Sequence, residues 1–133
     1  MLLIHEIIEN NPLGPISTDV LHLMVHKLVE RSISEKNFIR SESKAALVSL
    51  ENKPDALQEG VIFSLCELSQ DKNPTIQELA GSSLSAVISN CRNQVSSINN
   101  STYSALATTT FKCLNGKRMQ LKKSAKEIGS ILL

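Results

Sequence analysis

The segment DKNPTIQELAGSSL, residues 71–84, predicts a turn followed by a helix, and it decides the fold of this chain. Asn73 is a residue type that caps helix N-termini, and Pro74 suits the first helical position because its missing N–H costs nothing there. From Ile76 onward, apolar and small residues recur at the spacing of a helix buried on one side. These residues are Ile76, Leu79, Ala80, Ser83, Leu84, Val87, Ile88 and Cys91.

The same phrase occurs twice more, once starting at Glu35 and once at Asn115. Ile39, Ile76 and Leu121 align. Each is followed directly by Arg, Gln or Lys, and the residue four positions after the aligned apolar residue is small. The small residues are Ser43, Ala80 and Ala125. The aligned phrases are 37 and 45 residues apart. Recurrence in this range indicates a solenoid of helix pairs.

Helical periodicity extends along the chain, and no stretch alternates convincingly with period two. We therefore expect an all-α domain of about seven antiparallel helices, as three helix pairs behind a leading helix, with no sheet. Pro54 is expected to start a helix, and Gly116 to take a left-handed conformation after one. The expected helices span about 2–10, 18–31, 38–50, 54–70, 74–90, 102–114 and 119–132, with a polar loop at 92–101.

A chain of 133 residues suits one domain with one core. Aromatic residues make up only 3% and Trp is absent, so aliphatic side chains must build that core. Tyr103 and Phe111 are expected to be core residues, whereas Phe38 is excepted because it falls at the edge of a turn. Both ends of the chain are apolar and lack the polar surface that caps a solenoid. This favours stacking on further repeats or self-association.

The net charge is only +1, but the charge is unevenly distributed. Residues 1–90 carry 7 basic and 12 acidic side chains, a net of −5, whereas residues 91–133 carry 7 and 1, a net of +6. A basic end favours an acidic partner. The basic residues near the C-terminus have no aromatic residues interleaved among them for base stacking, so nucleic acid is the less favoured partner. These basic residues are Lys117, Arg118, Lys122, Lys123 and Lys126.

Three cysteines, an odd number, fall within helical patterns at Cys66, Cys91 and Cys113. This arrangement predicts buried, reduced thiols and an intracellular protein. The first nine residues lack a basic region and are too short an apolar run for a signal peptide or membrane span. We therefore expect no membrane association.

The repeated phrase resembles the HEAT repeat, in which a turn leads into Val/Ile-Arg and then small and Ala/Leu positions. The stretch KNFIRSESKAAL at residues 36–47 is similar to a phrase of the TOG domains, the HEAT arrays that bind tubulin, in particular those of the crescerin and CLASP type. The resemblance covers most of the chain, as the later half of a TOG array. It implies a HEAT-type α-solenoid that binds tubulin without enzymatic activity, in the cytoplasm at the cytoskeleton or cilium.

TOG domains grip tubulin with the turns that precede the Ile-Arg type helices, all on one edge. The first turn of many TOG domains carries a Trp that packs on tubulin, and this chain has no Trp. Either the Trp-bearing repeat lies outside this sequence, or tubulin binding is weak or absent. The alternative function is a general HEAT scaffold that holds a peptide or protein subunit on its concave helix face. On this chain the resemblance implies the tubulin-binding residues Lys36, Asn37, Phe38, Arg40, Lys72, Asn73, Lys117 and Arg118.

Enzymatic chemistry finds little support in the sequence. His22 and His26 are four residues apart on a helix and share a face, but no third metal ligand is evident near them. A metal-dependent enzyme at this pair is the third and least favoured hypothesis. The chain has no Gly-rich phosphate loop, no Cys-x-x-Cys pair and no nucleophile motif. We therefore expect a protein that is not an enzyme and has no cofactor.

Overall fold

The computed structural model describes residues 2–10, 12, 16–53, 56–116 and 118–132, and within these ranges it is all-helical with no strand. The expectation of an all-α protein is confirmed. The elements are α1 (Leu2–Asn10), α2 (Thr18–Arg31), α3 (Asn37–Glu51), α4 (Glu59–Leu68), α5 (Pro74–Asn90), the 3-10 helix η1 (Arg92–Ser97), α6 (Asn100–Leu114) and α7 (Met119–Leu132).

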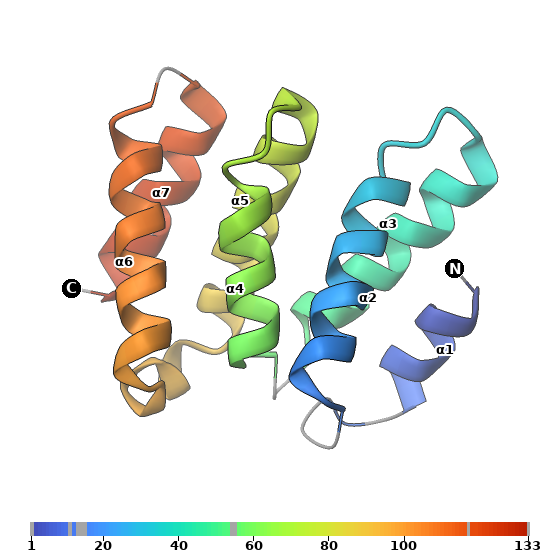
Figure 1. Ribbon diagram of the computed structural model, residues 1–133, viewed down its shortest axis with the longest axis horizontal. Helices are drawn as coiled ribbons and strands as arrows, with labels where there is room; N and C mark the ends of the chain where they lie inside the picture. Colours follow the sequence, from blue (N-terminus) through green and yellow to red (C-terminus); the bar gives the residue numbers. More distant parts are fainter. Residues whose placement is uncertain (1, 11, 13–15, 54–55, 117, 133) are drawn as a thin grey trace.

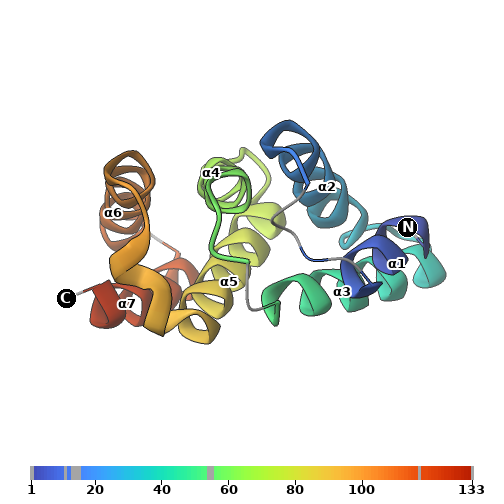
Figure 2. The same ribbon diagram turned by 90° about the horizontal axis from the view of Figure 1, so that it is seen from below.

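The helices form three hairpins, α2–α3, α4–α5 and α6–α7, which lie side by side (Figure 1). One layer contains α2, α4 and α6, and the second contains α3, α5 and α7 (Figure 2). Helix α1 packs against α3. Within each layer successive helices run in the same direction, so the three turns inside the hairpins lie along one edge of the molecule, uppermost in Figure 1.

Two helix starts are fixed by side-chain caps, and the cap at Asn73 is the one that the sequence predicts. Asn73 caps α5, because its side-chain Oδ1 accepts hydrogen bonds from the backbone N–H of Thr75 at 2.8 Å and of Ile76 at 3.4 Å. Ser17 caps α2 by accepting from the Val20 N–H at 3.3 Å. Since these caps satisfy backbone donors that the helix itself leaves unpaired, they fix where each helix begins.

The core is aliphatic and runs through all three hairpins. Ser43, Ala80 and Ala125, the small residues of the repeated phrase, are all buried where their helices meet a neighbour. Helix α4 is buried over more than one face, because it packs against α2, α5 and α6. Small side chains at these three positions allow α3, α5 and α7 to pack closely against the core.

The three cysteines are buried and free, as expected. Burial raises the pKa of the Cys66 and Cys113 thiols, so both are held in the protonated, unreactive form.

Among the described residues, no helix combines the length and the hydrophobicity that a membrane crossing requires.

Helix α4 begins at Glu59, so the predicted start at Pro54 is wrong; Pro54 itself lies outside the described residues. Ala56 is fully buried, and the Gln58 N–H donates to the Ala56 carbonyl at 2.9 Å in a tight turn. Gln58 is then extended. The chain thus places an apolar side chain in the core before the helix starts, which a helical periodicity count cannot distinguish from an extra turn of helix.

Helix α6 presents a different face to the core than its apolar pattern predicts. Phe111 is 67% exposed and Tyr103 39%, so the expectation that these two aromatics are core residues is wrong. The inner stripe of α6 is polar instead. It consists of Thr102, Leu106, Thr109, Thr110 and Cys113. The Thr110 hydroxyl donates to the Leu106 carbonyl at 2.8 Å, and a threonine satisfied in this way can be buried.

Two further expectations about turns need correction. Gly116 has no positive φ, so it is not a left-handed cap; its N–H donates to the Cys113 carbonyl at 3.2 Å in a tightened last turn. The predicted loop at 92–101 contains η1, in which Val95 is buried, and α6 already begins at Asn100. Asn99 caps α6 by accepting from the Thr102 N–H at 2.8 Å.

The substitution Ser43→Ala is expected to stabilise the protein by about 1 kcal/mol. The Ser43 hydroxyl is buried and has no hydrogen-bond partner among the described residues, and the equivalent position is alanine in the other two repeats. Urea denaturation measures the change, with exposed Ser41→Ala in the same helix as the control for helix propensity. A loss of stability in Ser43→Ala beyond that of the control would show that the hydroxyl is hydrogen-bonded.

Candidate functional site

The three turns inside the hairpins form one edge, here called the turn edge: residues 32–36, residues 69–73, and residues 115, 116 and 118 (Figure 1). The edge therefore brings together the regions that contain the predicted site residues. Lys117, one of these residues, lies outside the described part of the chain.

The first two turns share one hydrogen-bond pattern, displaced by 37 residues along the chain. The Lys36 N–H donates to the Ser34 hydroxyl at 3.2 Å, and the Asn73 N–H donates to the Asp71 carboxylate at 2.9 Å. In each turn, the residue six positions further along donates a side-chain hydrogen bond to the backbone carbonyl of Ser34 or Asp71. This residue is Arg40 in the first turn and Gln77 in the second.

Three of the predicted binding residues make side-chain hydrogen bonds within these turns. The Arg40 guanidinium donates to the Ser34 carbonyl at 3.0 Å and also to the Asn37 side-chain oxygen. A guanidinium held by two acceptors has lost much of its freedom to reach a partner, although it still places positive charge at the edge. Arg40 and Asn37 thus act first as the clip that shapes the turn. Asn73 is used similarly, as the cap of α5.

The remaining predicted residues within the described part of the chain are exposed. Lys36 and Lys72 are exposed, and Phe38 is 66% exposed at the start of α3. Arg118, also exposed, lies 3.6 Å from the Glu78 carboxylate of α5, which joins the third turn to the second hairpin. An exposed ion pair of this kind contributes little to stability, so Arg118 remains available for exchange with a partner's carboxylate.

A groove of about 520 Å³ lies between the second and third turns. Side-chain amides and cations line it, among them Gln70, Gln77, Lys112 and Arg118. Amide N–H groups and cations are the donors that a carboxylate accepts from. The groove therefore suits an acidic side chain from a partner.

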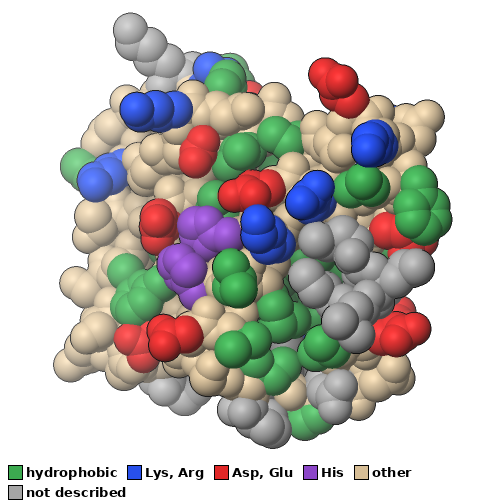
Figure 3. Space-filling model, turned by 45° about the vertical axis from the view of Figure 1, so that its right-hand side comes forward, with side chains coloured by type: hydrophobic (Ala, Val, Ile, Leu, Met, Phe, Trp, Pro, Cys, Tyr) green, Lys and Arg blue, Asp and Glu red, His purple; other side chains and the backbone are tan. Residues whose placement is uncertain are grey.

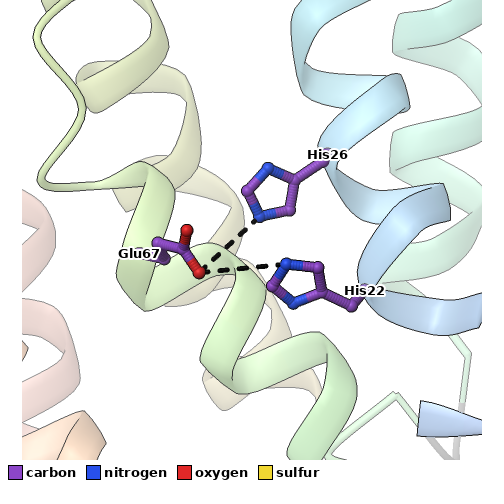
Figure 4. Close-up of side chains that lie close together, drawn as sticks. All are labelled: His22, His26 and Glu67. Carbon is purple, nitrogen blue, oxygen red and sulfur yellow. Dashed lines mark ion pairs between the residues drawn. The ribbon is translucent and has the colours of Figure 1, made fainter. Parts of the chain in front are cut away.

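A second cluster lies away from the turn edge, where α2 crosses α4. His22 and His26 stack with ring centroids 4.3 Å apart, and Glu67 approaches both (Figure 4). The Glu67 carboxylate oxygen lies 3.9 Å from the Nε2 of His22 and 4.0 Å from the Nε2 of His26. Figure 3 shows the two imidazoles as one patch on the surface, with acidic side chains nearby.

The sequence predicted that the two histidines share a face, but Glu67 was missed. Glu67 is 41 residues from His26 in the chain, and it reaches the pair because α4 runs alongside α2 in the same layer. The repeat itself was the available signal, since stacked repeats place parallel helices side by side. The repeat does not give the rotation of α4 about its own axis, and this rotation decides which residue of α4 faces the two histidines.

Comparison of the chain with protein-family models, with curated proteins and with solved structures finds no match.

Proposed function

We propose that this chain is a non-enzymatic binding module of the HEAT type, TOG-like in its recognition of tubulin through the turn edge. The observation that carries the proposal is the common edge formed by three hairpin turns, two of which repeat the same hydrogen-bond pattern 37 residues apart. Stacked repeats that display equivalent turns in a row make an extended recognition surface. The small buried residues Ser43, Ala80 and Ala125 support the same repeat assignment.

The chemistry of the turn edge favours an acidic protein surface. Lys36 and Lys72 are exposed in the first two turns, and Arg118 adds a cation at the third. The groove between the second and third turns supplies Lys112 and two glutamine amides to a carboxylate. Exposed Phe38, at the start of α3 beside the first turn, adds an apolar contact.

The test is co-elution of the purified chain with free tubulin at low salt, measured by size-exclusion chromatography and titration. The double charge reversal Lys36→Glu/Lys72→Glu is expected to weaken binding by about tenfold or more, since each reversal replaces an attraction with a repulsion. Both side chains are exposed and make no ion pair among the described residues, so the fold is expected to survive.

The matched control is Arg92→Glu/Lys126→Glu, which changes the net charge equally but lies outside the turns. Arg92 belongs to η1, on the opposite edge (Figure 1), and Lys126 is exposed within α7. This control is expected to bind nearly as well as the original chain. Equal losses in both variants would mean that net charge alone drives binding, and unchanged binding in the turn variant would remove the turn edge as the site.

A scaffold function is the second candidate, because apolar side chains remain exposed on the helices of one layer. Leu23 on α2 is 60% exposed and Phe111 on α6 is 67% exposed. Such side chains suit a peptide or protein subunit laid across helix faces. A partner held there would be lost on Leu23→Glu/Phe111→Glu and retained on Lys36→Glu/Lys72→Glu, the reverse of the result expected for the turn edge.

A further inference from the structure

We propose that His22, His26 and Glu67 form a binding site for a divalent transition-metal ion, with Zn²⁺ as the best-fitting probe. The site lies between α2 and α4, away from the turn edge, so it stands independently of the proposed function. Each residue offers one ligand atom, and these three atoms all lie within 4.8 Å of one another. Two histidines and one carboxylate are a donor set that zinc sites use.

The spacing of the three atoms suits a shared ion better than direct hydrogen bonds. The distances of 3.9 and 4.0 Å from the Glu67 oxygen to the two Nε2 atoms exceed hydrogen-bond length. Ligands of a tetrahedral Zn²⁺ with bonds of about 2.0–2.1 Å lie about 3.3 Å apart. A movement of roughly half an ångström brings the Glu67 oxygen to that distance from each Nε2. The Glu67 side chain is 65% exposed and free to make it. The two stacked imidazoles must also turn about their side-chain bonds, because the three ligand atoms lie within 4.8 Å of one another.

Ser64 favours one tautomer of the neutral His22 ring. Its hydroxyl donates its single hydrogen to the Gly60 carbonyl at 2.7 Å, so toward the His22 Nδ1, 3.0 Å away, it can only accept. In the neutral imidazole the hydrogen is therefore on Nδ1 and the lone pair is on Nε2, the atom that faces Glu67. A metal-binding histidine is oriented in this way by a hydrogen bond to its other nitrogen.

His26 supplies the second observation. Its Nε2 is buried and has no hydrogen-bond partner among the described residues. Buried polar atoms in folded proteins almost always have partners, and an unpartnered one is a candidate for a missing ion or water. Here the unpartnered nitrogen faces the same carboxylate oxygen as the His22 Nε2 (Figure 4). One cation would satisfy all three atoms at once.

The donor types select the class of ion. Imidazole nitrogen suits zinc, copper, nickel and iron, whereas magnesium and calcium prefer oxygen. The His22 side chain is 42% exposed and the His26 side chain 22%, so solvent completes the coordination. Because α2 and α4 belong to successive hairpins, the bound ion ties the first hairpin to the second.

The test uses the whole chain, treated with chelator and then titrated with Zn²⁺ by calorimetry, with thermal unfolding as a second readout. Saturation at one ion per chain and a rise in Tm are expected, since an ion that binds only the folded state stabilises it. Mg²⁺ is expected to give neither effect. Co²⁺ bound in place of Zn²⁺ is expected to show ligand-field bands without sulfur charge transfer, which separates this site from the cysteines.

The variants Glu67→Gln and His26→Ala are each expected to weaken Zn²⁺ binding by about tenfold or more. Glu67→Gln keeps the shape of an exposed side chain, so it tests the site without threatening the fold. Glu30→Gln, on α2 but outside the cluster, is the matched control and is expected to retain affinity. The proposal would be overturned if the original chain bound no Zn²⁺. It would also be overturned if Glu67→Gln and His26→Ala bound Zn²⁺ as tightly as the original chain.

Discussion

Replacement of Gly60 by valine is expected to destabilise the fold by about 3 kcal/mol, and replacement by alanine by about 1–2 kcal/mol. Gly60 lies in the first turn of α4, directly against the start of α2. A Cβ at this position would meet the Thr18 carbonyl oxygen at 3.0 Å, the Leu21 Cβ at 3.1 Å and the Thr18 Cα at 3.3 Å. None of these atoms is the far end of a flexible side chain, so α2 and α4 must move apart.

Gly129→Ala is the matched control for this series. Gly129 lies in α7, and a Cβ there would have no heavy atom within 4 Å. Alanine is therefore expected to stabilise the protein by about 0.5–1 kcal/mol through helix propensity alone. Urea denaturation of the four proteins measures both effects. Stabilisation by Gly60→Ala equal to that by Gly129→Ala would mean that α2 and α4 do not pack as closely as described.

Glu51→Gln is expected to stabilise the protein at pH 8 by about 1–2 kcal/mol and to have almost no effect at pH 4. Burial at the end of α3 raises the pKa of Glu51 from its ordinary 4.5 to about 7. A hydrogen bond from Ser83 on α5 lowers the pKa, but it offsets only part of the cost of burial. Glutamine resembles the protonated carboxyl and carries no charge at any pH.

The direction of the pH dependence follows from how many protons the folded and unfolded states bind. Between pH 4.5 and about 7 the folded state holds the Glu51 proton more tightly than the unfolded state. The free energy of unfolding therefore falls as pH rises through this window. The carboxyl is partly exposed to water, so the effect is smaller than the full change in pKa would give.

Urea denaturation at pH 4 and pH 8 measures the effect of Glu51→Gln, with exposed Glu6→Gln on α1 as the control. The control is expected to show the same small change at both pH values. A Glu51→Gln variant that loses stability at pH 8 would mean that the ionised carboxylate is stabilised by its neighbours, contrary to this account.

Much of the fold could be predicted because local chemistry fixes it. Asn73 with Pro74, and Ser17 before α2, mark helix starts through backbone hydrogen bonds that need no distant partner. The buried positions Ser43, Ala80 and Ala125 followed from the repeated phrase alone. These features depend on residues within about one helical turn of each other, which is the range that sequence periodicity records.

The prediction failed where packing competes with local pattern. On α6 two stripes were available, one aromatic and one rich in threonine, and the threonine stripe packs inward because at least Thr110 satisfies its hydroxyl within the helix. Ala56 is buried before α4 begins, so its apolar character looked like helix. A hydrophobicity scale ranks threonine as a polar residue. It does not account for a hydroxyl that is hydrogen-bonded to a backbone carbonyl of its own helix and can therefore be buried.

The candidate site was predictable only in part. The turns were located by the repeat, and their common edge follows from parallel stacking of the hairpins. The clip made by Arg40 with Ser34 and Asn37 was not predicted, because a long polar side chain has many possible partners. Glu67 beside the two histidines was missed for a related reason, since the contact depends on how α4 is rotated against α2.

The central claim is that the three hairpin turns act together as one binding edge, and amide NMR of the isotopically labelled chain tests it most directly. On addition of tubulin, the signals expected to shift or broaden beyond the uniform effect of a larger complex are those of the turn edge, residues 32–36, 69–73, 115, 116 and 118, and of Phe38 beside it. Changes confined to η1 and the opposite edge, or to the faces of α2 and α6, would contradict the claim, as would the absence of any change.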